Sequence, residues 1–340
     1  MRIEQERFYG AKSEPVDATE VVAREQVGEF EWQLLDVTHG DVTDTYQVLT
    51  DGSRDVLATD AGARAYARHF AGLDDARPLG AEQSNTTLVV EGELLKVYRR
   101  LEGGLNPEIE LLSRIGDCPH VAAVTGTIER GGRTVAMLQE RIDGGVDGFD
   151  LATAGEVDAD DARELGAALR RVHAALKDAF GTERVDVAKQ LLRNLASYGE
   201  AVGDYAARVR ELYEGLGEVE VQRVHGDAHL GQTLRTADRW YLVDFEGEPA
   251  RPLRERRRPD HVLRDVAGMV RSFGYARAVG GFDEEWERER VEALLDGYGA
   301  EHSALLRAYV VDKACYEVVY ERNNRPEWVE IPLNAVKTLL

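Results

Sequence analysis

The most informative segment of this chain reads His225-Gly226-Asp227-Ala228-His229-Leu230-Gly231-Gln232, and Asp244-Phe245-Glu246 follows it. Phosphoryl transfer requires an acid that accepts the proton of the attacking hydroxyl, an amide that helps to hold a metal ion, and a second acid that bridges the metal to nucleotide phosphates. Asp227, Gln232 and Asp244 supply these groups in that order. We therefore predict Asp227 as the catalytic residue, and Gln232 and Asp244 as metal ligands.

The spacing of 17 residues between Asp227 and Asp244 supports this interpretation. It leaves room for a catalytic loop, a short apolar strand at residues 240–243 and a metal-binding turn. Two alternatives are a polar hairpin that carries acids and a histidine by chance, and a pseudokinase that binds nucleotide without catalysis. A proton acceptor at Asp227 argues against the second, because a binding module does not need one. We expect His225 to brace the loop rather than to transfer protons.

The sequence resembles the aminoglycoside phosphotransferase-like kinases, and within them the maltokinase group of actinobacterial sugar kinases, over almost its full length. The related glucosamine kinases are similar in architecture. Besides the two segments quoted above, the resemblance is carried by Arg7-Phe8-Tyr9-Gly10-Ala11-Lys12, Glu82-Gln83-Ser84-Asn85-Thr86, Leu263-Arg264-Asp265-Val266-Ala267-Gly268-Met269, Tyr316-Glu317 and Asn324-Arg325-Pro326-Glu327-Trp328. It implies an α/β, bilobal protein kinase-like fold with an N-terminal β-rich cap and a mainly helical C-terminal lobe.

We predict three regions: a cap at residues 1–77, a nucleotide-binding portion at 78–142, and a helical lobe with the catalytic and sugar sites at 143–340. In the cap, apolar and β-branched residues favour strands at 28–37 and 44–49, and a helix is expected at 61–70. In the helical lobe, apolar residues recur every three or four positions at 160–176 and 187–216.

The nucleotide-binding portion should contain strands at 85–90 and 93–98, followed by a helix capped by Asn106 with Pro107 in its first turn. Lys96 lies in the second strand. It should reach the nucleotide phosphates and be held by a helix carboxylate. Glu108 and Glu110 are the candidates, and the resemblance favours Glu110. A lysine of an edge strand that extends its amine to solvent is the alternative.

Two further groups of residues should contact ATP. The resemblance places Ser84, Asn85 and Thr86 at the phosphates, since their hydroxyls and backbone amides can donate hydrogen bonds. Residues 135–142 form an apolar strand that ends where a hinge between lobes would lie. Adenine should bond there to backbone groups around Gln139, Glu140 and Ile142.

Acidic and aromatic side chains near the C-terminus suggest a sugar site. Glu317 and Glu321 lie four residues apart on one expected helix, and like charges at that spacing repel each other. Another group must therefore offset this repulsion. Nearby arginines such as Arg322 and Arg325 are one explanation, and a cationic sugar is the other. The predicted substrate-binding residues are Asp227, His229, Glu246, Glu317, Glu321, Arg325 and Trp328. We expect Asp265 to support the catalytic loop from a helix start, with a surface N-cap as the alternative.

The formal net charge of −21 argues against nucleic acid or an anionic membrane as a partner, although solubility alone also explains it. Two distant cysteines, Cys118 and Cys315, give no disulfide framework or zinc spacing. The polar N-terminal residues and the lack of a long apolar run favour a cytoplasmic location. We also expect a monomer.

We therefore predict an ATP-dependent sugar kinase that uses Mg²⁺. Glucosamine, converted to its 6-phosphate, is the first candidate substrate because the chain is compact and its tail acidic. Maltose, converted to its 1-phosphate, is the alternative. An aminoglycoside phosphotransferase and a pseudokinase are lesser alternatives.

Overall fold

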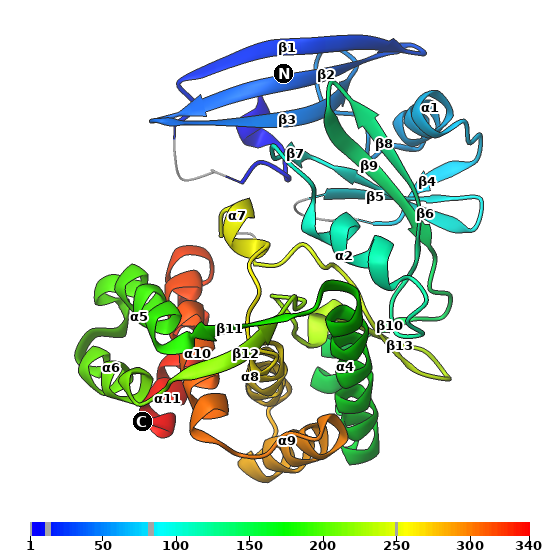
Figure 1. Ribbon diagram of the computed structural model, residues 1–340. Coiled ribbons are helices and arrows are strands. Elements are labelled where there is room, and N and C mark those ends of the chain that lie inside the picture. The colour runs from blue at the N-terminus through cyan, green and yellow to red at the C-terminus, as the bar shows by residue number, and fades with distance from the viewer. Residues whose placement is uncertain (1, 11–14, 81–84, 249–250) are drawn as a thin grey trace. The chain divides into compact units, whose positions relative to one another are not determined.

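A computed structural model describes residues 2–10, 15–80, 85–248 and 251–340 of the chain. The chain forms two compact units (Figure 1). The first unit comprises Met1–Ser113 and Ala122–Ile142, and the second comprises Arg114–Val121 and Asp143–Leu340. The first unit is built mainly of strands and the second mainly of helices. The α/β character and the helical second half of the chain are as predicted.

The first unit contains two antiparallel sheets, ordered β1-β2-β3-β7 and β4-β5-β6-β9-β8. The first sheet consists of β1 (Ala18–Val27), β2 (Phe30–His39), β3 (Val42–Thr50) and β7 (Arg100–Leu101). The second consists of β4 (Ala76–Pro78), β5 (Asn85–Val90), β6 (Glu93–Tyr98), β8 (Val124–Arg130) and β9 (Arg133–Glu140). The expected strands of the nucleotide-binding portion are present, and β1 is a strand that the sequence pattern did not reveal.

Strand β2 carries buried residues on both faces, and each face packs in a separate core. Trp32 and Leu34 point into a large core that also contains residues of β5, β6 and β9. Leu35 and Val37, on the opposite face, pack in a smaller core with Ile3 and other N-terminal residues. Because successive side chains of a strand alternate between faces, one strand can serve both cores. The short 3₁₀ helix η1 (Ile3–Gln5) covers the second face.

Two helices complete the first unit, both where the sequence predicts them. Helix α1 (Asp60–Ala71) begins at Thr59, whose hydroxyl accepts the Gly62 N–H, and ends at Gly72 in the left-handed conformation. Helix α2 (Pro107–Ile115) begins after Asn106, whose side-chain oxygen accepts the Glu108 N–H at 2.8 Å.

The second unit surrounds one central helix, α8 (Leu263–Gly280). Most of the α8 residues are buried, and the helix contacts α3, α9, α10 and α11. The other helices of the second unit are α3 (Gly148–Thr153), α4 (Ala159–Phe180), α5 (Val187–Tyr198), α6 (Ala206–Glu214), α7 (Leu253–Arg256), α9 (Glu284–Tyr298), α10 (Ala304–Asn324) and α11 (Glu330–Leu339). The shorter elements are β10 (Val146–Asp147), β11 (Thr182–Asp186), β12 (Glu218–Gln222), β13 (Thr233–Arg235), β14 (Trp240–Leu242), η2 (Gly199–Tyr205), η3 (Leu230–Gln232) and η4 (Pro326–Trp328).

The helical pattern at residues 187–216 does not form one continuous helix. It is divided into α5, η2 and α6, because Gly199 and Gly203 have φ values of 55° and 48°, outside the helical region. Among the described residues, none of the helices is both long and apolar enough to cross a lipid bilayer.

Candidate active site

The loop that contains Asp227 is fixed by one face of helix α8. Asp265, Gly268 and Ser272 are spaced three and four residues apart, so they share that face. Asp265 accepts the backbone N–H groups of His225 and Gly226 at 2.8 and 2.9 Å. The Ser272 hydroxyl accepts the Leu230 N–H at 2.9 Å. The expected support of the loop by Asp265 is present, and the alternative of a surface N-cap does not apply because Asp265 is only 1 % exposed.

Asp265 is held as a carboxylate in spite of its burial. Burial by itself raises the pKa of an acid, but hydrogen bonds from His173 and from the loop backbone lower the pKa of Asp265 below its ordinary value. His173 donates from Nε2 to Asp265 at 2.9 Å, and its Nδ1 lies 2.8 Å from the Tyr298 hydroxyl.

Glycine at position 268 allows the loop to lie directly on α8. A Cβ at this position would lie 2.1 Å from the Ala228 carbonyl oxygen. Within the loop, Gly226 has a φ of 86°, in the region that favours glycine.

His225 connects the loop to the segment that carries Asp244. Its Nε2 lies 2.9 Å from the Val243 carbonyl oxygen, which can only accept, so this nitrogen carries the proton. The other nitrogen, Nδ1, accepts the Asp227 N–H at 3.3 Å. The ring also packs on Phe245, with ring centroids 4.4 Å apart. Both nitrogens are therefore used structurally, as a bracing role requires.

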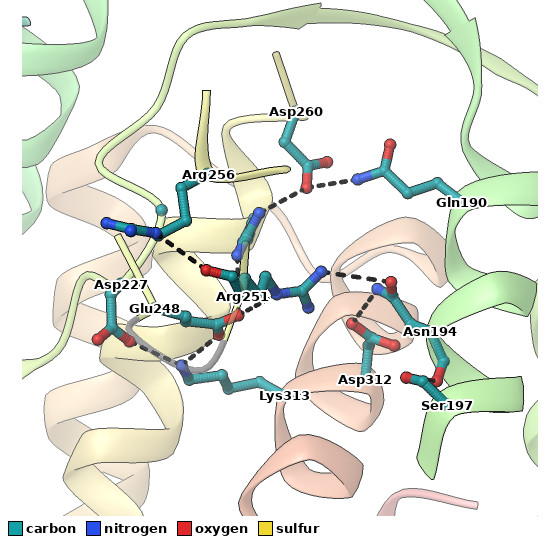
Figure 2. Close-up of polar contacts among 12 residues, drawn as sticks. Gln190, Asn194, Ser197, Asp227, Glu248, Arg251, Arg256, Asp260, Asp312 and Lys313 are labelled. Carbon is teal, nitrogen blue, oxygen red and sulfur yellow. Dashed lines mark hydrogen bonds and ion pairs between the residues drawn. The ribbon is translucent and has the colours of Figure 1, made fainter. Parts of the chain in front are cut away.

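Asp227 forms an ion pair with a lysine of α10. Lys313 Nζ lies 3.0 Å from Oδ1 of Asp227 and 2.8 Å from Oε1 of Glu248. Figure 2 shows the ammonium group between the two carboxylates. Burial lowers the pKa of a lysine, but Asp227 and Glu248 together raise the pKa of Lys313 above its ordinary value. Lys313 is thus a fixed cation, and it fixes one oxygen of Asp227.

Glu248 is the centre of a larger network. It is 2 % exposed and also bonds to Arg251 and, at 3.0 Å, to Arg264. Burial acts to raise the pKa of Glu248, but Lys313, Arg264 and Arg251 outweigh it and lower that pKa. Three cations around one carboxylate hold the segment after Asp244 against α8 and α10.

The predicted metal ligands lie together. The Val243 N–H donates to the Gln232 carbonyl at 3.0 Å, which aligns the two segments, and Gln232 Nε2 donates to Asp244 Oδ2 at 3.0 Å. Asp244 has a φ of 62°, uncommon for a residue with a side chain. A carboxylate oxygen of Glu246 lies within 4.8 Å of one of Asp244. Carboxylate and amide oxygens are the donors that Mg²⁺ prefers, so these residues fit that ion.

A cavity of about 410 Å³ opens beside Asp227, within the second unit. Its lining includes six of the seven predicted substrate-binding residues, namely Asp227, His229, Glu317, Glu321, Arg325 and Trp328. Glu246 is not in this lining and lies beside Asp244 instead. Burial lowers the pKa of His229, so its imidazole is neutral at neutral pH.

The two acids of α10 differ in how they are paired. Glu317 bonds through Oε2 to Arg271 of α8 at 2.9 Å, and among the described residues none bonds to its Oε1. Glu321 accepts from Arg325 with both oxygens, at 2.7 and 2.8 Å, and from the Tyr275 hydroxyl. Arg325 also lies 4.4 Å from the centroid of the Trp328 ring. Of the local arginines suggested for these acids, only Arg325 is used, and a distant residue, Arg271, serves Glu317.

In the first unit, Lys96 is bonded to Glu108 rather than to the favoured Glu110. Lys96 Nζ lies 2.8 Å from Glu108 Oε2, and the Tyr98 hydroxyl lies 3.3 Å from the same oxygen. Residues 96 and 98 share a face of β6, and Glu108 is in the first turn of α2. Glu110 is two residues further, on another side of the helix, and is only partly buried. Lys96 is 7 % exposed in a strand between β5 and β9, which excludes an edge-strand lysine.

The other predicted nucleotide contacts stay predictions. Ser84 is outside the described residues. Asn85 and Thr86 are buried in β5, where Asn85 Oδ1 accepts the Arg99 N–H at 3.3 Å. Gln139 and Glu140 end β9, and the Glu140 N–H donates to the carbonyl of Ala123, the residue before β8. Ile142 is the last residue of the first unit.

Sequence reasoning missed Lys313 and Ser272 as parts of the site. Lys313 had a detectable signal: it lies four residues before Glu317 and eight before Glu321, so all three share one helical face. Ser272 follows Asp265 by seven residues, again one face of a helix. Asp147 and Asp150, at the start of α3, also line the cavity and had no such signal.

The chain belongs to the phosphotransferase enzyme family, whose model matches residues 75–307, more than half of the sequence. It is 25 % identical over 316 residues to a glucosamine kinase of Mycolicibacterium smegmatis, a match that covers 78 % of this chain and 79 % of that protein. It is 27 % identical over 262 residues to a glucosamine kinase of Streptacidiphilus jiangxiensis, covering 63 % and 60 %. A solved structure of a glucosamine kinase in complex with glucosamine, ADP and inorganic phosphate is similar, with a TM-score of 0.69 and 23 % identity over 96 % of this chain and 95 % of that one.

Proposed function

We propose that this phosphotransferase transfers the γ-phosphoryl group of ATP to a hydroxyl of glucosamine, forming glucosamine 6-phosphate. One observation carries the proposal: the catalytic-loop acid Asp227 and the α10 acid Glu317 line the same cavity. Asp227 suits a hydroxyl that must lose its proton, and Glu317 suits an ammonium group. The names of the two relatives and the ligands of the similar structure support this choice of substrates.

Asp227 acts as the proton acceptor. Lys313 occupies its Oδ1, which leaves Oδ2 to accept the proton of the sugar hydroxyl. The sugar oxygen then forms a bond to the γ-phosphorus in line with the bond to the β-γ bridging oxygen, which breaks and releases ADP. This attack needs no covalent enzyme intermediate. The rate acceleration comes from holding the sugar hydroxyl and the γ-phosphate in the geometry of attack. The loop contacts with Asp265 and Ser272 keep the acceptor in place.

ATP and Mg²⁺ are the proposed cofactors. In the first unit, the Lys96 amine, oriented by Glu108, would bind nucleotide phosphates. In the second, Asp244 and Gln232, with Glu246 beside them, would hold Mg²⁺. When bound, Mg²⁺ neutralises charge that develops on the phosphate oxygens.

Recognition of the amino group is assigned to Glu317. Its Oε1 has no partner among the described residues, whereas both oxygens of Glu321 accept from Arg325. Glu321 therefore acts indirectly, by holding Arg325 against Trp328, which would form a surface for the sugar ring. Burial raises the pKa of Glu317, so amine recognition should weaken as the pH falls through that value and the carboxylate is neutralised.

A coupled assay of ADP release with glucosamine, glucose, maltose and kanamycin tests the substrate. Glucosamine should be the best substrate, and Glu317→Gln should raise its KM by about tenfold or more through loss of a charged hydrogen bond, with a smaller effect on glucose. Glu327→Gln, an exposed acid outside the cavity, is the matched control. Higher kcat/KM for maltose or kanamycin would assign the alternative substrates, and ADP release independent of any sugar would contradict the proposal.

Two further expectations belong to this proposal. A cytoplasmic enzyme needs no disulfide, and both cysteines, Cys118 and Cys315, are buried free thiols. A monomer suffices because the substrate cavity is lined by residues of one unit of one chain. Light scattering at assay concentration measures the mass, and twice the chain mass would contradict the monomer.

A further inference from the structure

A second cavity, of about 570 Å³, lies in the same unit as the active site. Its walls come from α5, from α7 and the residues beside it, from the start of α8, and from α10. Tyr316 lines this cavity and also the substrate cavity, so the two share a wall. We call it the arginine cavity, because Arg193, Arg251, Arg258 and Arg264 line it. Its size is within the usual range for small-molecule sites.

The guanidinium groups of two of these arginines have no paired carboxylate in the part of the chain that the structure describes. Arg193 and Arg258 are exposed, and neither guanidinium group forms an ion pair or a hydrogen bond with the described residues. Asp260, an acid in the lining, is already bonded to Arg264, Gln190 and Tyr309. Glu255 is the other acid of this lining, and Glu183 and Asp186 line an adjoining cavity together with Arg193 and Arg258. In a protein with a net charge of −21, four arginines around one cavity form a local concentration of positive charge.

The remaining two arginines add hydrogen-bond donors at fixed positions. Arg251 donates to Glu248 through Nε and to Asn194 through Nη1 at 3.4 Å (Figure 2). Among the described residues, none accepts from its Nη2. A guanidinium group presents its N–H donors in a planar fork that matches the oxygens of a phosphate group.

We propose that the arginine cavity binds a small phosphorylated ligand, with Arg193 and Arg258 as its main charge contacts and Arg251 as a further donor. A phosphate monoester dianion matches both the charge and the fork geometry of these groups. This site is distinct from the proposed ATP and sugar sites, since neither Asp227 nor Asp244 lines it.

A ligand in the arginine cavity would affect how Asp227 is positioned. Arg251 bonds Glu248, Glu248 bonds Lys313, and Lys313 bonds Asp227 (Figure 2). Arg264 also bonds Glu248. An anion that competes with Glu248 for Arg251 therefore alters the pairing of the lysine that positions Asp227.

Isothermal titration calorimetry with inorganic phosphate and with glucose 6-phosphate tests the site, at ionic strength matched with NaCl so that general screening is constant. The double variant Arg193→Gln/Arg258→Gln should lose about tenfold or more in affinity, since each arginine supplies a charged hydrogen bond. Both side chains are exposed, so folding should be unaffected. Arg210→Gln, an exposed arginine of α6 outside the cavity, should bind as the wild type does.

Each probe is titrated with and without saturating ADP and Mg²⁺, which separates this site from the proposed nucleotide site. Equal affinity in both conditions supports the arginine cavity, and it does so whether or not the protein phosphorylates glucosamine. Stronger binding of glucose 6-phosphate identifies a phosphomonoester as the ligand, and equal or stronger binding of inorganic phosphate identifies the free ion. The proposal is overturned if neither probe binds, if ADP abolishes the binding, or if the double variant binds as tightly as Arg210→Gln.

Discussion

Lys313 and Asp227 form an ion pair, with Nζ and Oδ1 3.0 Å apart, although they are 86 residues apart in the sequence. The same ammonium group bonds Glu248. The residue proposed to accept the substrate proton is therefore oriented by a cation of the helix that also supplies Glu317 to the cavity.

Replacing Lys313 tests this role. Lys313→Met keeps the aliphatic chain but removes the charge, so Asp227 loses its orientation and Glu248 loses one of three cations. We expect kcat to fall about a hundredfold, which is a typical cost of misplacing a catalytic group. Initial rates at saturating ATP and sugar measure it. Lys337→Met, an exposed lysine of α11, should keep wild-type kcat, and equal activity of the two variants would contradict a positioning role for Lys313.

The support of the loop by Asp265 predicts a large cost in stability. Asp265→Ala leaves the buried N–H groups of His225 and Gly226 without an acceptor, so the free energy of unfolding should fall by about 3 kcal/mol. Urea denaturation measures it. Asp283→Ala provides the comparison, because Asp283 is an ordinary helix N-cap of α9 and its loss should cost about 1 kcal/mol. Similar losses of unfolding free energy in the two variants would show that Asp265 contributes no more than an ordinary helix N-cap.

The close approach of Ala228 to α8 predicts a selective loss of activity. In Gly268→Ala the new methyl group would lie 2.1 Å from the Ala228 carbonyl, so the loop must shift. We expect kcat/KM to fall by about tenfold or more. Gly217→Ala in the same unit is the control, since its methyl would meet no atom within 4 Å. Unchanged kcat/KM in Gly268→Ala would show that the loop tolerates the shift.

Asp312 predicts a pH dependence of stability. Burial raises the pKa of Asp312 to about 6, above the ordinary value of an aspartate. The folded state thus binds the proton more tightly than the unfolded state does, and the stability from this group is lost as the pH rises through 6. Relative to Asp312→Asn, the wild-type free energy of unfolding should increase by about 1 kcal/mol between pH 7 and pH 5. Parallel pH profiles of the two proteins would contradict the raised pKa.

The catalytic segment could be predicted because its chemistry is local in sequence. Asp227, Gln232 and Asp244 lie within one loop and hairpin, and the register that pairs Thr233 with Leu242 brings the last two together. The choice of Glu108 over Glu110 could not be predicted, because it depends on how α2 is rotated relative to β6. The positions of Lys96 and Tyr98 in the strand do not indicate how α2 is rotated.

The partners of the substrate acids depend on tertiary packing. Arg271 reaches Glu317 from α8, and Lys313 reaches Asp227 from α10, so neither pair follows from spacing within one element. The break at Gly199 and Gly203 was missed because the apolar period continues across it. These are the positions at which long-range packing, not local propensity, determines the structure.

Transfer of the γ-phosphoryl group to glucosamine, followed by ³¹P NMR with ATP and Mg²⁺, tests the central claim most directly. Wild-type protein should form a sugar phosphate ester with one ADP per ester, and Asp227→Asn should reduce the rate by about a thousandfold, the range expected for loss of a general base. Ester formation by Asp227→Asn at the wild-type rate, or hydrolysis of ATP without any ester in the wild type, would contradict it.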